Sequence, residues 1–202
     1  MTASLVNREL IDGVLNSPLE TDVVSSPVGD VIVVVCDGVL LALDFEDYRA
    51  RMMKLLHKRF GTVQLVRVDN PAGMCDHVKQ YFAGELSALE SMPMATGGTD
   101  FQRQVWQGLR KISPGSVMTY GELAKAMNNP KAVRAVGMAN SLNPISIALP
   151  CHRVVGASGQ LTGYAGGLER KQWLLAHEGA LQTSANSHEM PASADTQLSV
   201  FS

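Results

Sequence analysis

The sequence has no long apolar run and few cysteines, and both absences limit what the protein can be. No stretch approaches the ~18 uninterrupted apolar residues of a membrane helix, and the first residues lack the basic and apolar segments of a secretory leader. The cysteines, Cys36, Cys75 and Cys151, form an odd and sparse set that offers no disulfide framework. We therefore expect a soluble cytoplasmic protein in a reducing compartment, without membrane contact.

Charged residues make up 18% of the 202 residues, which is ordinary for a soluble globular protein, but they are unevenly distributed. Residues 1–98 have a net charge of −5, whereas residues 99–182 have a net charge of +5. A basic half is typical of a domain that binds a polyanion. The length allows one large or two small domains.

The first half predicts a small α/β domain over residues 1–92, followed by a linker over residues 93–98. Two β-branched runs flank Asp37-Gly38, which is a strong signal for a two-residue hairpin. Cys36 and Cys75 fall on core faces, where a buried cysteine is inert. The predicted elements are a loose helix over 1–20, strands over 31–35, 39–45 and 62–68, and helices over 47–60 and 70–84.

The second half predicts a mainly α-helical domain over residues 99–182. Thr99 and Gln102 have the spacing of a capping box at the start of a helix. Two short helices, 120–127 and 131–140, are joined by a tight turn and predict a helix-turn-helix. Another helix is expected over 168–177. Residues 183–202, rich in Ser, Ala and Thr, predict a disordered tail.

The second helix of this pair lacks most side chains that read base edges in a major groove. It offers Lys131, Arg134 and Met138 beside Ala132, Ala135 and Ala139. Small residues let a helix backbone approach a narrow minor groove, and the one arginine can fill the space of a displaced base. The alternative is an ordinary core helix whose alanines pack inward.

The pair Cys151-His152 is the main candidate for chemistry. It follows an apolar run, Ile145–Leu149, that predicts a short buried strand, and Pro150 should end that strand. The thiolate is the nucleophilic form of cysteine, and a histidine can take the thiol proton through a water molecule. The alternative is a buried structural cysteine beside a surface histidine.

Two features after Cys151 favour the reactive alternative. Residues 156–167 contain five glycines around Tyr164, so this loop can bring its backbone close to a flat ligand. Glu178 follows the predicted last helix, where a carboxylate opposes the helix dipole. That position suggests a role for Glu178 other than helix stability.

Several motifs resemble the O6-alkylguanine-DNA alkyltransferases, and in particular their bacterial constitutive branch. The resemblance covers residues 99–180, whereas the first half agrees only in length and α/β order. It implies a ribonuclease-like α/β domain followed by a mainly α domain with a winged helix-turn-helix. The motifs are Phe101–Trp106, Tyr120–Ala124, Asn143–Ile147, Pro150–Val154, Gly163–Gly167 and Trp173–Gly179.

The resemblance implies single-turnover repair of double-stranded DNA, in which the alkyl group of O6-alkylguanine or O4-alkylthymine moves irreversibly to Cys151. His152 takes the thiol proton, Glu178 holds His152, Asn143 braces the site, Tyr120 donates to guanine N3, and Lys171 supports the thiolate or the departing oxygen. The implied substrate-binding residues are Asn140, Ser146, Val154, Tyr164, Ala165 and Gly166. The implied DNA-binding residues are Tyr120, Lys131, Ala132, Arg134, Ala135 and Gly137.

Two departures from eukaryotic relatives concern the pocket. Ser146 stands where those relatives have proline and Ala165 where they have serine, and both changes predict a wider pocket. The zinc-ligand pattern of some relatives does not match, so we expect no metal and no cofactor. We expect a monomer, and cooperative binding along DNA stays open.

Three other functions remain as alternatives. A hydrolase using Cys151, His152 and Glu178 would need an oxyanion hole and would turn over. A non-catalytic binder of alkylated DNA would have no use for Cys151. A transcriptional regulator would need base-reading side chains that the second helix lacks.

We predict that Arg134→Ala impairs repair of alkylated duplex DNA far more than transfer from free O6-benzylguanine. The duplex substrate requires nucleotide flipping, which costs a few kcal/mol, and the free base does not. Rates on both substrates test this. An equal loss on both would mean that Arg134 supports the fold rather than flipping.

Overall fold

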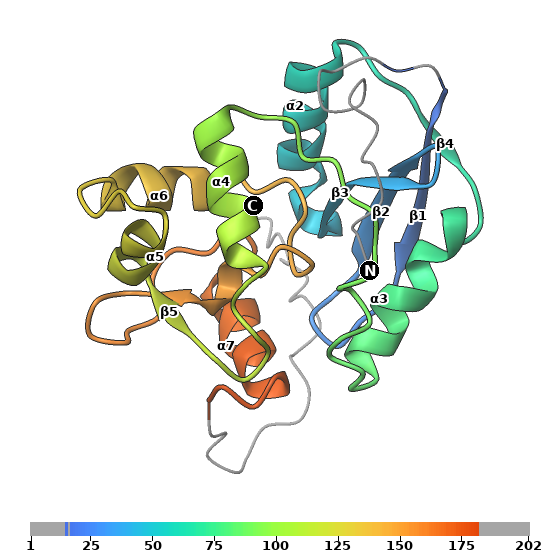
Figure 1. Ribbon diagram of the computed structural model, residues 1–202. Helices are drawn as coiled ribbons and strands as arrows, with labels where there is room; N and C mark the ends of the chain where they lie inside the picture. Colours follow the sequence, from blue (N-terminus) through green and yellow to red (C-terminus); the bar gives the residue numbers. More distant parts are fainter. Residues whose placement is uncertain (1–14, 16, 182–202) are drawn as a thin grey trace, which may run out of the picture.

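The computed structural model describes residue 15 and residues 17–181 (Figure 1). A four-stranded sheet in the order β3-β2-β1-β4 forms the centre of the first half. Strand β1 pairs antiparallel with β2 and parallel with β4, and β2 pairs antiparallel with β3. The strands are β1 (Leu19–Val24), β2 (Val31–Cys36), β3 (Val39–Phe45) and β4 (Leu65–Arg67).

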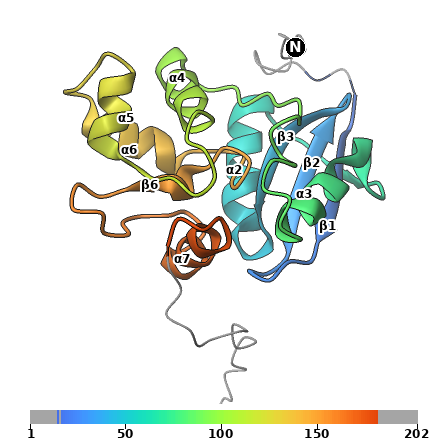
Figure 2. The same cartoon turned by 60° about the horizontal axis from the view of Figure 1, so that its bottom comes forward.

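Helices cover both faces of this sheet (Figure 2). Helix α2 (Arg49–Phe60) packs on the face that carries Ile32, Val34 and Cys36, and α3 (Met74–Phe82) packs on the face that carries Val31, Val33 and Val35. Burial on both faces explains why β2 is a continuous apolar run rather than an alternating one. Short 3-10 turns, Glu46–Tyr48 and Pro71–Gly73, precede the two helices.

The sequence predicted β2, β3 and both helices, but it missed β1. The loose helix expected over residues 1–20 is wrong at its end, because Leu19 begins a strand. Polar residues in β1 hide its pattern, and pairing on both sides stabilises it. The rest of that expected helix lies mostly outside the described residues, as does the tail over 183–202.

The second half is mainly helical, as predicted. Capping boxes at Thr99 and Thr119 begin α4 and α5, and the pairing of β5 with β6 is parallel. None of the helices in the described part of the chain is long and apolar enough to cross a membrane. The elements are α4 (Asp100–Leu109), β5 (Met118–Thr119), α5 (Tyr120–Ala126), α6 (Val133–Ser141), a 3-10 turn (Cys151–Arg153), β6 (Val154–Val155) and α7 (Leu168–His177).

The outer edge of β3 joins the two halves. The amide of Leu40 donates to Pro93 O (2.9 Å), and the amide of Ala95 donates to Leu40 O (3.0 Å). Further along the same edge, Leu43 N donates to Pro144 O (3.1 Å) and Ser146 N donates to Leu43 O (2.7 Å). Part of the expected linker 93–98 and the segment before Cys151 are therefore both held on the sheet.

The strand expected over Ile145–Leu149 is wrong, although all five residues are buried. Only Ile145 forms a β-bridge, with Leu43, and the chain then turns. Ile147 has a φ of 69°, a left-handed conformation that a β-branched residue rarely adopts, and Leu149 N donates back to Ile145 O. The run is apolar because it is buried, not because it is extended.

Candidate active site

Cys151 begins the 3-10 turn that follows this buried segment, rather than following a strand end. Cys151 as a whole is 3% exposed, and Asn143 Nδ2 donates to its Sγ at 3.2 Å. Burial raises the pKa of the Cys151 thiol, and the bond from Asn143 opposes that rise because it favours the thiolate. Asn143 is itself fixed, since its Nδ2 also donates to Leu149 O and its Oδ1 accepts from Ile145 N.

A buried polar network holds His152 next to this cysteine. His152 Nε2 lies 2.9 Å from Glu178 Oε1. Arg153 donates to both carboxylate oxygens of Glu178, at 2.7 and 2.8 Å, and the Tyr81 hydroxyl donates to Oε1 at 2.7 Å. The alternative of a surface histidine is wrong, because the His152 side chain is fully buried.

The charges in this network point to a neutral histidine beside an ionised carboxylate. Burial lowers the pKa of His152, and Glu178 opposes that shift. Burial would raise the pKa of Glu178, but the bonds from His152 and Arg153 outweigh it and hold the net pKa well below its usual range. With Nε2–H donating to Glu178, Nδ1 is left as an acceptor, and it is buried with no hydrogen-bond partner among the described residues. His152 can therefore take a proton at Nδ1.

Cys151 lines a cavity of about 260 Å³. The cavity brings together three of the six expected substrate-binding residues, Asn140, Tyr164 and Ala165, along with two residues that sequence reasoning missed, Ser141 and Gly163. Asn140 Oδ1 and the Tyr164 hydroxyl are buried without a hydrogen-bond partner in the described chain. The lining residues are Tyr120, Gly137, Asn140, Ser141, Cys151, Gly163, Tyr164 and Ala165.

Three other expected site residues, Val154, Gly166 and Lys171, do not line the cavity. Lys171 is fully buried, and its Nζ donates to Val154 O at 2.6 Å and to Thr162 O at 2.7 Å. Burial lowers the pKa of Lys171 to about 8. Gly166 packs against Phe45, and a Cβ on Gly166 would lie 2.4 Å from the Phe45 ring. These residues shape the loop around the cavity.

Ser146 does not lie where the pocket-width hypothesis needs it. It is 1% exposed and is not among the residues that line the cavity. Its hydroxyl donates to Asp44 Oδ1 at 3.4 Å, and its amide bonds to β3. A proline at position 146 would remove that amide donor from the junction, so any effect of Ser146 on the alkyl group is indirect.

Helix α6 carries the expected DNA-binding face. Arg134 and Ala135 are exposed on α6, and Gly137 lines the cavity. Lys131 and Ala132 precede the helix, which begins at Val133 rather than at 131. The core-helix alternative fails for Ala135. It holds for Ala139, which is buried and whose carbonyl accepts from Trp106 Nε1 at 2.9 Å.

Sequence reasoning missed Arg153 and Tyr81. Arg153 belongs to the motif around Cys151, and a basic residue there was the available signal. Tyr81 lies on α3, 97 positions before Glu178, and only its spacing from Met74 and Val78 indicated an inward position.

Cys36 and Cys75 are buried as expected, and burial raises their pKa values to about 11 and about 12. The described residues include no cluster of three or more His, Cys, Asp or Glu side chains able to hold a metal.

Two family models match the chain. The ribonuclease-like domain of 6-O-methylguanine DNA methyltransferase matches residues 21–96, and the DNA binding domain of the same enzyme matches residues 100–180. The boundary between the matches, residues 97–99, directly follows the segment held on β3.

Known proteins resemble the chain over most of their length. The methylated-DNA–protein-cysteine methyltransferase of Shigella flexneri is 50% identical over 162 residues, which cover 78% of this chain and 94% of that protein. The protein of the same name from Mycolicibacterium paratuberculosis is 41% identical over 163 residues, which cover 79% of this chain and 92% of that protein. Among solved structures, Mycobacterium tuberculosis OGT in complex with DNA has a TM-score of 0.69 at 38% identity, covering 79% of this chain and 92% of that one. The O6-methylguanine-DNA methyltransferase of Pyrococcus kodakaraensis has a TM-score of 0.64 at 31% identity, and the match covers 80% of this chain and 99% of that one.

We predict that Glu178→Gln raises the Cys151 pKa seen in the pH dependence of iodoacetamide labelling, because protonated His152 loses its carboxylate. It should also lower the free energy of unfolding by about 3–5 kcal/mol, because the buried guanidinium of Arg153 loses its counter-charge. Tyr81→Phe is the control, since it removes one hydrogen bond, worth about 1 kcal/mol, and keeps the carboxylate. Labelling with the wild-type pH profile in folded Glu178→Gln would contradict this role.

Proposed function

The chain belongs to the methylated-DNA–protein-cysteine methyltransferase family, and we propose that Cys151 is the cysteine that receives the alkyl group. The protein repairs DNA by transferring an alkyl group from a damaged base to its own cysteine. The observation that carries the assignment is the position of the Cys151 thiol, which lies at a cavity beside α6 and accepts a hydrogen bond from Asn143. Cys36 and Cys75 are buried away from this cavity.

The proposed reaction is a displacement at the saturated carbon of the alkyl group. The thiol proton passes through water to His152 Nδ1, and Glu178 stabilises the imidazolium that forms. The thiolate then forms an S–C bond while the C–O bond breaks and the electron pair stays with the base. Tyr120, at the cavity wall, donates a proton to guanine N3 as the base leaves. The thioether is stable to water, so each molecule acts once.

The substrate is proposed to be a nucleotide turned out of duplex DNA. A base inside the duplex cannot reach a buried sulfur, so it must leave the stack. We assign DNA contact to the exposed face of α6 because its C-terminal residues, Asn140 and Ser141, continue into the cavity wall. Arg134 fills the space left in the duplex, and Lys131 adds positive charge on the side that faces DNA. The small residues Ala132, Ala135 and Gly137 allow close approach to the minor groove. O4-alkylthymine is proposed as a second substrate of the same cavity.

Other expected roles remain part of the proposal. Lys171 and Gly166 hold the glycine-rich loop, so that Tyr164 and Ala165 face the alkylated oxygen. The positive charge of Lys171 also favours the thiolate. We propose a two-domain division at residues 93–98 and action as a monomer.

Asn140 is proposed to recognise the exocyclic amine of guanine. Its Nδ2 donates to Cys151 O at 3.4 Å, which leaves Oδ1 as a buried acceptor without a partner at the cavity. The two amine hydrogens of guanine are donors that a buried acceptor needs. Alkylthymine has no corresponding amine.

Incubation with a duplex that contains O6-methylguanine, followed by intact-mass measurement, tests the function. We predict one added methyl group per molecule, mapped to Cys151. Cys151→Ala should reduce transfer below detection, which is a loss of at least about 1,000-fold, and should keep DNA binding. More than one turnover per molecule would favour the hydrolase. Methylation of Cys36 or Cys75 would overturn the assignment.

Asn140→Leu tests recognition of the amine. We predict that the variant slows transfer from O6-methylguanine about 10-fold, which is the effect of losing one buried hydrogen bond. Transfer from O6-methylhypoxanthine, which lacks the amine, should change much less. An equal loss on both bases would assign Asn140 to the fold of the turn around Cys151.

A further inference from the structure

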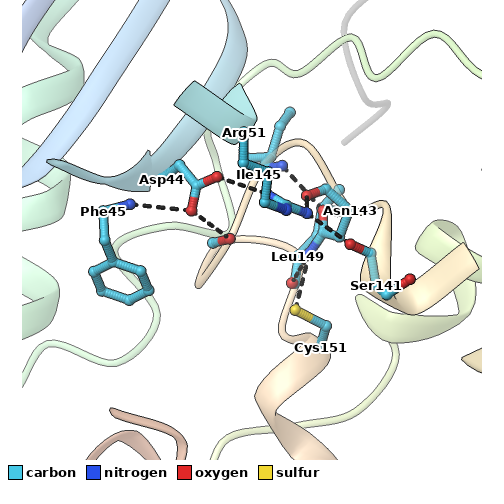
Figure 3. A network of polar contacts seen from close by, with 9 residues as sticks. Asp44, Phe45, Arg51, Ser141, Asn143, Ile145, Leu149 and Cys151 are labelled. Atoms are coloured by element: carbon cyan, nitrogen blue, oxygen red, sulfur yellow. Dashed lines mark hydrogen bonds and ion pairs between the residues drawn. The ribbon is translucent and has the colours of Figure 1, made fainter. Parts of the chain in front are cut away.

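An ion pair of the first domain reaches the residue that holds the thiol (Figure 3). Asp44 lies on β3 and Arg51 lies on α2. Arg51 Nη1 donates to Asp44 Oδ2 at 2.6 Å. Arg51 Nη2 then donates to two backbone carbonyls of the second domain, Ser141 O at 2.8 Å and Asn143 O at 2.9 Å. The exposed side-chain fraction is 22% for Arg51 and 1% for Asp44, so the pair is largely shielded from solvent.

These two carbonyls mark two parts of the site. Ser141 is the last residue of α6, and the final carbonyls of a helix lack partners within the helix. A cation at this end is also favourable for the helix dipole. Arg51 therefore caps the helix proposed to bind DNA, and the same nitrogen fixes the backbone of Asn143.

Asn143 carries this constraint to the sulfur. Its side chain donates to Cys151 Sγ and to Leu149 O, at 3.2 and 2.8 Å. Asp44 acts on the same turn from the other side, because its Oδ1 accepts from Ser146 Oγ. Figure 3 shows the continuous path from Asp44 through Arg51 and Asn143 to Cys151.

We propose that Asp44 and Arg51 are positioning residues for alkyl transfer, which hold Asn143 against Cys151 and fix the end of α6 to the same guanidinium. This inference rests on the proposed function. It assigns the first domain a direct part in preparing the thiol. A purely structural salt bridge between domains is the competing explanation, and it makes different predictions.

Electrostatics separates the two explanations. The groups that act on the Cys151 thiol come from several elements: Arg51 on α2, Lys171 on α7 and Asp44 on β3, with the buried Tyr164 hydroxyl facing it from the loop. Arg51 and Lys171 favour the thiolate, whereas Asp44 disfavours it. Removing Arg51 and removing Asp44 should therefore shift the reactivity of the thiol in opposite directions.

The experiment compares Arg51→Met, Arg51→Lys and Asp44→Asn with Arg49→Met as the matched control. Arg49 lies on the same helix and pairs with Glu46 in a half-exposed ion pair away from Asn143. Three quantities are measured: the pH midpoint of iodoacetamide labelling mapped to Cys151, the rates with O6-benzylguanine and with alkylated duplex, and the free energy of unfolding in urea.

For Arg51→Met we expect the labelling midpoint to rise by roughly 0.5 pH unit or more. Its transfer rates should fall about 10- to 100-fold on both substrates, because the site is misplaced before any base enters. Arg51→Lys should keep a midpoint near the wild-type value, since its charge remains, with a smaller loss of rate. Asp44→Asn should lower the midpoint, and Arg49→Met should leave all three quantities unchanged.

Midpoints that stay constant, or that move in the same direction in Arg51→Met and Asp44→Asn, would overturn the proposal and leave a structural ion pair. If Arg51→Met does not fold, Arg51→Lys and Asp44→Asn still decide between the explanations through the midpoint. The labelling measurement needs no DNA. Failure of the wild-type protein to take up methyl from DNA would therefore refute the proposed function without deciding the role of the pair.

Discussion

The buried carboxylate of Glu178 is the interaction on which the site depends. It accepts hydrogen bonds from His152, Arg153 and Tyr81, which come from the turn after Cys151 and from α3 of the first domain. An unpaired charge at this depth would be strongly unfavourable. The need to pair it fixes the end of α7, the turn after Cys151 and the face of α3 relative to one another. The imidazole orientation follows from this arrangement.

Local patterns predicted much of the fold. The Asp37-Gly38 hairpin has positive φ at both residues, as a type I′ turn requires, and helix α7 has the predicted bounds. The apolar run Ile145–Leu149 was assigned as a strand because strands and buried turns share a composition. Its conformation depends on a bridge to Leu43 about one hundred residues earlier, which no local window contains.

The active site was likewise predicted only in part. Cys151, His152, Asn143 and Glu178 come together as the motifs implied, whereas the partners of Glu178 and Asn143 from the first domain were not predicted. Tyr81, Asp44 and Arg51 act across long sequence separations, and their local surroundings are those of ordinary core or surface residues. Ser146 shows the converse error, because a position within a motif does not determine which way its side chain faces.

The covered edge of β3 has a consequence for self-association. A free strand edge offers unpaired amides and carbonyls to another chain and is a common starting point for aggregation. Here residues 93–95 and 144–146 occupy that edge, while the opposite edge strand, β4, has only three residues and ends in a charged one, Arg67. A protein consumed by its own reaction must wait in the unreacted state until damage occurs. The same backbone contacts that build the reactive turn also keep the waiting molecules from pairing through their sheets.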